Sequence, residues 1–203
     1  MFRNTFQLWT VHTAKPTTRT RQASTSTDPA CTGNDPNDIV STIECVQDKM
    51  ISSKVIELVS NNIASTYITC PPLSSRGASS LGIKLPYLTF LVKNMDQYVS
   101  FEVQVVDDQQ QTRRFRCSNY QLETRVKPGI TTMPLRLESG WNQMVFDLAD
   151  LVKRAYATTY VETARVTVHA NCRLRRIYFA DRLCGEDDLP PEFKLFLPVD
   201  KNN

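Results

Sequence analysis

The chain has 203 residues, of which 41% are hydrophobic and 22% are charged. This balance is ordinary for one folded domain and excludes a chain that is disordered throughout. The formal net charge of +3 hides a concentration of cations, because residues 112–176 carry 12 Lys and Arg against 5 Asp and Glu, a net charge of +7. Such a segment indicates an acidic partner, which is nucleic acid, an acidic protein surface or a membrane. Solvated strand faces with local ion pairs explain the same charge equally well.

The cysteines and the apolar runs exclude several other classes of protein. The six cysteines show no C-x-x-C pair and no regular spacing, so neither a zinc framework nor a redox motif is expected. No long apolar stretch follows the first residues, which predicts a chain without a signal peptide that stays in the reducing cytosol with free thiols. No apolar run approaches the roughly 20 residues that span a bilayer, so we expect a soluble protein with no membrane contact.

The first 50 residues are predicted to form a largely irregular N-terminal arm. Residues 10–42 are rich in Thr, Ser, Pro, Asp and Asn, with almost no large apolar side chain between Val11 and Ile39. Such a segment cannot bury enough surface to offset the entropy lost on ordering, so we expect it to become ordered only against a partner. Residues 51–203 are expected to form the folded domain.

From about Lys54 the chain is composed of short strand-like runs bounded by turn residues. Alternation is clear where Phe101, Val103 and Val105 flank the polar Glu102 and Gln104. The expected strands are 55–59, 65–70, 81–93, 98–106, 112–118, 120–126, 141–146, 161–169, 173–180 and 193–197. This pattern predicts an all-β fold, a single β-sandwich or jelly roll.

One short helix interrupts the strands after residue 147. Apolar residues recur there at helical spacing, at Leu148, Leu151, Val152 and Ala155. Asp147 is suited to cap the N-terminus, and Asp150 early with Lys153 and Arg154 late suits the helix dipole. We expect this helix to cover one open end of the sandwich.

The run from Thr112 to Pro128 alternates arginines with apolar residues. Since successive side chains of a strand point to opposite faces, Phe115 and Cys117 are expected inside and Arg114 and Arg116 outside. We predict that a partner-binding surface is formed by Arg113, Arg114, Arg116, Lys127, Arg173, Arg175 and Arg176. The alternative is that these arginines form ion pairs within the chain, with Asp107, Glu102 or the acidic run at 186–188.

Residues suited to catalysis are scarce. The only histidines are His12 in the arm and His169 on a strand, and His169 with Cys172 lacks further metal ligands nearby. The pair Asp107 and Asp108 lies in an expected hairpin turn, where aspartate is favoured for its local hydrogen bonds. We therefore expect no enzyme activity, no metal and no cofactor.

Two other binding functions fit parts of the pattern. The basic strands suit phosphates, with Phe115 or Tyr178 available to stack on bases, although no named nucleic-acid module matches. A sugar-binding face needs aromatic side chains, which Trp141, Tyr120, Tyr156, Tyr160 and Tyr178 would supply, yet aromatics at strand spacing more often belong to the core.

Nine separated blocks of this sequence closely resemble the cilia- and flagella-associated protein twenty family. They occur in order as MFRNTFQ, STYITCP, LGIKLPYL, FEVQVVDD, RRFRCSNYQ, TRVKP, GWNQMVFDL, RRIYFADRL and EFKLFLPV. The resemblance covers essentially everything from Ser65 to Val199.

The resemblance implies a β-sandwich similar to carbohydrate-binding modules that acts as a structural part of the axoneme. Family members look like inner-junction proteins of the ciliary doublet microtubule, located where the B-tubule closes onto the A-tubule. The implied partners are tubulin, the parkin co-regulated gene product and other junction proteins. The implied location is the cytoskeleton of the cilium or flagellum, including the basal body, and no catalysis is implied.

The N-terminus departs from the family pattern. After MFRNTFQ this chain keeps Lys15 and Pro16 but lacks the strand-like residues that follow them in the family. The departure implies a divergent paralogue, such as one of sperm flagella, and the contacts of the family's first strands are not carried over.

Overall fold

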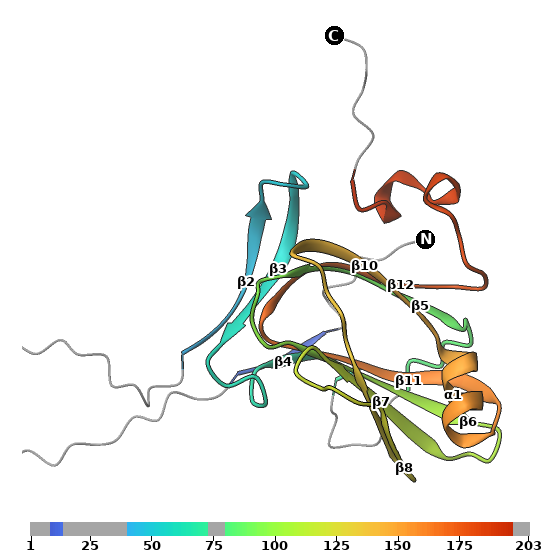
Figure 1. Ribbon diagram of the computed structural model, residues 1–203. Helices are drawn as coiled ribbons and strands as arrows, with labels where there is room; N and C mark the ends of the chain where they lie inside the picture. The colour runs from blue at the N-terminus through green and yellow to red at the C-terminus, as the bar shows by residue number, and fades with distance from the viewer. Residues whose placement is uncertain (1–8, 14–39, 73–79, 197–203) are drawn as a thin grey trace, which may run out of the picture.

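The computed structural model describes residues 9–13, 40–72 and 80–196, which form a sandwich of two sheets and one helix (Figure 1). This confirms the predicted all-β fold. One sheet has seven strands in the order β1 (Thr10–His12), β4 (Tyr67–Cys70), β11 (Tyr160–His169), β6 (Ser100–Asp107), β7 (Thr112–Ser118), β9 (Ile130–Pro134) and β8 (Arg125–Lys127). The other has five strands in the order β10 (Gly140–Asp147), β5 (Tyr87–Asn94), β12 (Cys172–Ala180), β3 (Ser53–Ser60) and β2 (Ser41–Asp48).

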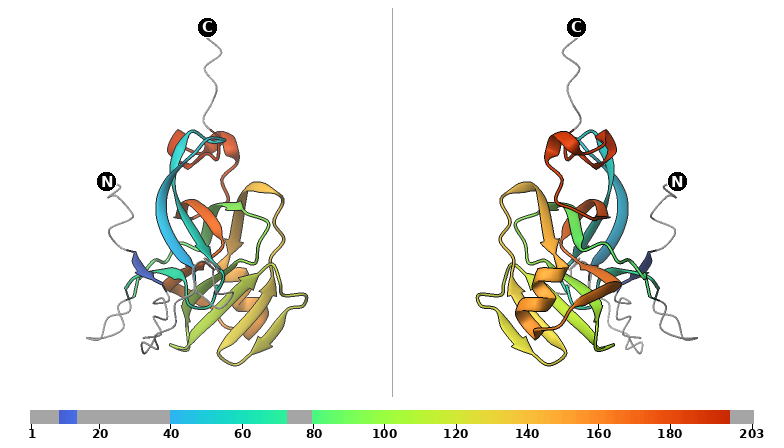
Figure 2. Two further views of the ribbon diagram at one scale, coloured as in Figure 1. Left: turned by 90° about the vertical axis from the view of Figure 1, so that its left-hand side faces the viewer. Right: turned by 90° about the vertical axis from the view of Figure 1, so that its right-hand side faces the viewer.

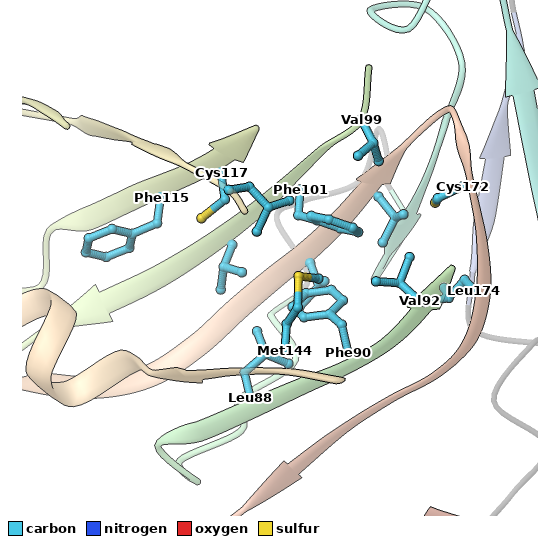
Figure 3. Packing of buried hydrophobic residues seen from close by; sticks show 14 of the residues in the cluster. Leu88, Phe90, Val92, Val99, Phe101, Phe115, Cys117, Met144, Cys172 and Leu174 are labelled. Carbon is cyan, nitrogen blue, oxygen red and sulfur yellow. The ribbon is translucent and has the colours of Figure 1, made fainter. Parts of the chain in front are cut away.

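The core lies between the two sheets and follows from the alternation of the strands. Phe90 of β5 and Phe101 of β6 are buried and meet with ring centroids 4.9 Å apart, which joins the centres of the two sheets. Figure 3 shows these two rings among smaller apolar side chains, with Phe115 and Cys117 extending the cluster along β7. Truncating a buried phenylalanine to alanine costs about 3–5 kcal/mol in such a setting, so this contact strongly stabilises the sandwich.

The helix α1 (Leu148–Tyr156) begins where the sequence predicts, directly after Asp147. The Asp147 side chain accepts a hydrogen bond from the Asp150 backbone N–H, 3.0 Å away, and caps the N-terminus. Leu148 and Val152 are buried. The helix connects β10 in one sheet to β11 in the other and covers one end of the sandwich (Figure 1).

The N-terminal region contains more regular structure than the sequence predicts. Within the range 1–50, β1 pairs with β4 and β2 pairs with β3 over its whole length. The sequence of β2 is too polar to be recognised as a strand by itself, because its apolar residues bury surface only when they pair with β3. The greater part of the predicted arm, residues 1–8 and 14–39, lies outside the described residues.

Other strand predictions also differ from the structure, and the predicted strand at 81–93 begins only at Tyr87. The predicted strand at 120–126 is a loop until Arg125, and β9, which the sequence did not reveal, pairs in parallel with β7. The predicted strand at 193–197 is replaced by a 3₁₀ turn, η3 (Pro191–Phe193), where two prolines remove backbone donors. Residue 197 is outside the described residues. A second 3₁₀ turn, η2 (Glu186–Asp188), precedes it.

The tip of the β2–β3 hairpin contacts strands β5, β10 and β12 of its own sheet. Figure 2 shows the hairpin and the C-terminal 3₁₀ turns projecting on the same side of the sandwich. At the hairpin's tip the buried Asp48 carboxylate accepts hydrogen bonds from Lys93 Nζ (3.0 Å), Arg173 (2.8 Å) and the Trp141 indole N–H (3.2 Å). Burial by itself would raise the pKa of Asp48, but these hydrogen bonds lower it well below its usual range. The carboxylate therefore ties the hairpin to three strands.

Across the described ranges, no helix is long and apolar enough to cross a bilayer. The helix α1 has 9 residues, and the two 3₁₀ turns have 3 each.

Replacing Asp48→Asn should destabilise the fold by about 2–4 kcal/mol, because a buried carboxylate that pairs two cations is lost. The measurement is urea unfolding at pH 7. Asp108→Asn is the control, since this carboxylate is exposed and should change stability by less than about 0.5 kcal/mol. Equal midpoints for the two variants would show that Asp48 does not stabilise the hairpin.

Candidate partner-binding face

Strand β7 holds Arg114 and Arg116 on the face opposite to its apolar residues, as predicted. Phe115 and Cys117 are buried, whereas the side chains of Arg114 and Arg116 remain 44% and 40% exposed. Burial raises the pKa of the Cys117 thiol to about 12, so it is protonated at neutral pH and unsuited to act as a nucleophile. The arginines therefore belong to the outer face of the seven-stranded sheet.

The strand register extends this face over β9 and β8. Arg114 lies opposite Ile130 of β9, which lies opposite Lys127 of β8. One step along, Arg116 lies opposite Thr132, which lies opposite Arg125. Paired residues of neighbouring strands point to the same side of a sheet. Two rows thus place four cations on one surface, here called the basic face: Arg114, Arg116, Arg125 and Lys127.

Glu102 of β6 orients two of these cations. Its Oε1 accepts a hydrogen bond from Arg116 Nε at 2.9 Å, and its Oε2 lies 3.4 Å from Arg114 Nε. His169 Nε2 is 3.6 Å from Oε1. Burial by itself would raise the pKa of Glu102, but the imidazole and the two guanidinium groups outweigh it and lower the pKa to about 2. The carboxylate stays ionised and holds the arginines extended at the surface.

The other two cations of the basic face have no ion-pair partner among the described residues. Arg125 and Lys127 are exposed, and neither forms an ion pair with another residue in the described part of the chain. Glu102 therefore pairs with only two of the four cations, Arg114 and Arg116, and the four cations with this one carboxylate give the face a net positive charge. The sequence analysis did not include Arg125 among the predicted binding residues. Its alternation with Lys127 in the run TRVKP is the pattern that could have placed both side chains on one strand face.

Arg113 is directed inward and stabilises the fold. Its Nε lies 2.8 Å from Asp107 Oδ2, one terminal nitrogen donates to the Pro128 carbonyl oxygen at 2.6 Å, and the guanidinium carbon lies 4.4 Å from the centroid of the Tyr156 ring. Its side chain is only 14% exposed. Burial by itself would raise the pKa of Asp107, but the backbone N–H of Gln111 and the Arg113 guanidinium lower it. This pair closes the turn after β6.

The three predicted arginines of β12 lie on the other sheet and contact the chain itself. Arg173 pairs with Asp48 at 2.8 Å and with Glu57 at 2.6 Å. Arg175 donates to the carbonyl oxygens of residues 194 and 195. The guanidinium carbon of Arg176 lies 5.0 Å from the centroid of the Phe193 ring. These residues secure the hairpin and the C-terminal turns, so the seven predicted cations do not form one surface.

The residues considered for catalysis are held in structural contacts. His169 Nδ1 is 3.0 Å from the Ile63 carbonyl oxygen. Burial raises the pKa of the Cys172 thiol to about 12. His12, expected in the arm, is on β1 with its ring stacked 4.5 Å from that of Tyr67. Within the described ranges, no group of three or more His, Cys, Asp or Glu is arranged to hold a metal ion.

The five aromatic residues considered for sugar binding do not share a platform. Trp141 donates to Asp48 on the five-stranded sheet. Tyr156 lies on α1 and donates to the Lys127 carbonyl oxygen at 3.2 Å, and Tyr160 on β11 donates to that of Ile83 at 2.8 Å. The remaining two, Tyr120 and Tyr178, lie in the loop after β7 and on β12.

Comparisons with known proteins agree on one family. The model of the CFA20 domain matches residues 1–197. A protein of Chlamydomonas reinhardtii named "Cilia- and flagella-associated protein 20" is 58% identical over 160 residues, which are 79% of this chain and 83% of that protein. Proteins of the same name from Caenorhabditis elegans (56% identical, 77% and 76% covered) and Paramecium tetraurelia (55%, 78% and 82%) are similarly close.

A solved structure with partial similarity is an endo-1,4-beta-glucanase, CelB2. It shares 8% identity at a TM-score of 0.39 and covers 70% of this chain and 86% of its own. At this level the likeness carries no information about activity.

Glu102→Gln should destabilise the protein at pH 7 by roughly 1–2 kcal/mol, because the paired charge that holds two arginines is removed. The native pKa of about 2 lies below the ordinary 4.5, so the carboxylate stabilises the fold above pH 4.5 and loses this effect as the pH falls toward 2. Urea unfolding of both proteins at pH 7 and pH 3 measures the effect. The difference should shrink at pH 3, and a constant difference would contradict the ionic origin. Glu123→Gln, at an exposed position, is the control.

Proposed function

The chain belongs to the CFA20 domain family, and we propose that it is a non-enzymatic structural protein of the ciliary or flagellar axoneme that binds microtubules. The family match covers nearly the whole chain, and the curated relatives are named for cilia and flagella. The more specific proposal is a microtubule inner protein at the inner junction, which helps to close the B-tubule onto the A-tubule.

The observation that supports microtubule binding is the basic face. Arg114, Arg116, Arg125 and Lys127 lie in two rows on one sheet surface, and Glu102 pairs with the first two of them. Tubulin presents a strongly acidic surface, and opposite charges across an interface steer association and fix orientation. Arg113, Arg173, Arg175 and Arg176 act indirectly in this proposal, because they hold the turns and the hairpin in place.

Stable attachment requires more than these charges. A solvent-exposed ion pair contributes on the order of 1 kcal/mol or less, so four of them supply limited affinity. An axonemal filament offers equivalent sites at regular intervals, and neighbouring proteins such as the parkin co-regulated gene product would add further contacts. Binding to several neighbours raises the effective concentration at each site without any single strong contact.

Nucleic-acid binding is the second candidate, and the same four cations support it. Phosphate-driven binding releases counterions and falls steeply with salt concentration. Phe115, the residue of β7 that the sequence offered for stacking, is buried and cannot contact a base. Pull-down with duplex and single-stranded probes at physiological salt should therefore yield little protein, and strong retention with a steep salt dependence would favour this candidate.

The double variant Arg125→Glu with Lys127→Glu should bind assembled microtubules roughly tenfold more weakly, because two exposed contacts of up to about 1 kcal/mol each are lost. Cosedimentation at fixed ionic strength measures the affinity. The matched control is Lys54→Glu with Lys84→Glu, which changes the net charge equally at exposed positions away from the basic face. Equal losses in the two double variants would assign the effect to overall charge and remove the basic face from the interface.

Extraction of intact axonemes in graded salt tests the junction role. A junction protein should stay with tubulin until the doublets open, because many neighbours hold each copy. Release of the protein at low salt from doublets that remain closed would contradict the role at the inner junction. Electron microscopy of the same fractions supplies the state of the doublets.

A further inference from the structure

An apolar groove lies between α1 and the β8–β9 edge of the seven-stranded sheet. Its volume is about 250 Å³. Its mostly apolar lining includes Phe115, Val126, Met133 and Leu151, together with Thr131 and Arg154. A space of this kind admits a bulky apolar side chain from outside.

The groove and the basic face occupy opposite sides of the same thin edge. In the register, Phe115 lies opposite Thr131, which lies opposite Val126, one residue out of step with the cations. Arg125 and Lys127 therefore point to one side of β8 while Val126 points to the other. Strand β8 has 3 residues and, of the strands in the described part of the chain, pairs with β9 alone, so no described strand covers the edge between the two surfaces.

The walls of the groove are fixed by hydrogen bonds. Thr131 Oγ1 donates to the Tyr156 hydroxyl oxygen at 2.9 Å, and that hydroxyl donates to the Lys127 carbonyl oxygen at 3.2 Å. These contacts join α1 to both edge strands while Val126 stays 52% exposed. The groove is therefore a preformed feature, and its apolar lining is in contact with solvent.

Cations outnumber carboxylates around the groove. On the strand side are Arg125 and Lys127, and on the helix side is Arg154 of the groove lining, all three of them exposed. Asp150 offsets part of this charge, since it lies 3.3 Å from Arg154. Glu123 precedes β8. An apolar groove flanked by net positive charge fits a segment that carries a bulky apolar residue between carboxylates.

We propose that this groove binds an acidic segment of a partner protein, with a leucine or aromatic side chain inserted between α1 and β8–β9. The segment wraps the open edge, so that its apolar residue occupies the groove while its carboxylates reach Arg125 and Lys127. The groove supplies the anchor that exposed ion pairs lack. The inference rests on the proposed function in taking the partner to be an acidic neighbour, whereas its test uses the isolated protein.

The test is selection of twelve-residue random peptides displayed on phage against the purified full chain. The expected result is enrichment of peptides with one or more bulky apolar residues among Asp and Glu. Binding of the best synthetic peptide is then measured by fluorescence anisotropy. Val126→Asp, which puts a charge into the groove at a half-exposed position, should weaken binding at least roughly tenfold, since a buried apolar contact is lost.

Two further variants separate the groove from the basic face and from general damage. Val145→Asp is the matched control, because Val145 is an exposed valine on β10 of the other sheet and should leave binding within about twofold. Arg125→Glu with Lys127→Glu should weaken binding roughly three- to tenfold. Unfolding midpoints of every variant are measured to exclude loss of fold.

Several results would overturn the proposal. These are a selection that enriches no sequence, one that enriches neutral or basic peptides, peptides that bind Val126→Asp as tightly as the unchanged protein, or self-association of the chain through this groove. Failure here with intact microtubule binding would leave the proposed function standing. A different result is that peptides bind while Arg125→Glu with Lys127→Glu cosediments with microtubules as well as the unchanged protein does. In that case the basic face is not the microtubule interface, and the proposal for the groove still stands.

Discussion

The register between β6 and β7 is the constraint on which the other features depend. Phe101 lies opposite Cys117, and Glu102 lies opposite Arg116, so one face of the pair is apolar and the other is charged. A slip of one residue would bury arginines against the core and expose the phenylalanines, which makes the register strongly determined. The same pairing packs the sandwich and fixes where the basic face lies.

Carboxylates decide which arginines are available to a partner. Asp107 and Asp48 are fully buried and bind Arg113 and Arg173 in contacts that close a turn and hold a hairpin. Glu102 is nearly buried but lies on the outer face of its sheet, so its two arginines are oriented and still about two-fifths exposed. The difference is one of burial, since a fully buried carboxylate keeps its cation in the fold. The basic segment therefore contains both structural arginines and candidate binding residues.

The elements that the sequence predicted correctly are those with a strong local signal. The alternation of β6 and β7 and the capped helix α1 need only neighbouring residues to be recognised. Strands β2 and β9 were not predicted. Each becomes a strand by pairing with a partner, β3 for β2 and β7 for β9, and the pattern of its own residues does not reveal that partner. The basic face was predicted in part, since Arg114, Arg116 and Lys127 were identified but Arg125 was not.

The sequence by itself determined the fold class, the family and the two-sided character of β7, because strand periodicity and ordered blocks of residues are properties of the chain alone. Only the tertiary structure decided which cations share a surface, since Arg114 and Lys127 become neighbours through Ile130 of an intervening strand. It also created the groove, whose walls come from β7, α1 and the β8–β9 edge. Side chains distant in the chain meet only when strand order and helix packing are set, and no local pattern specifies that order.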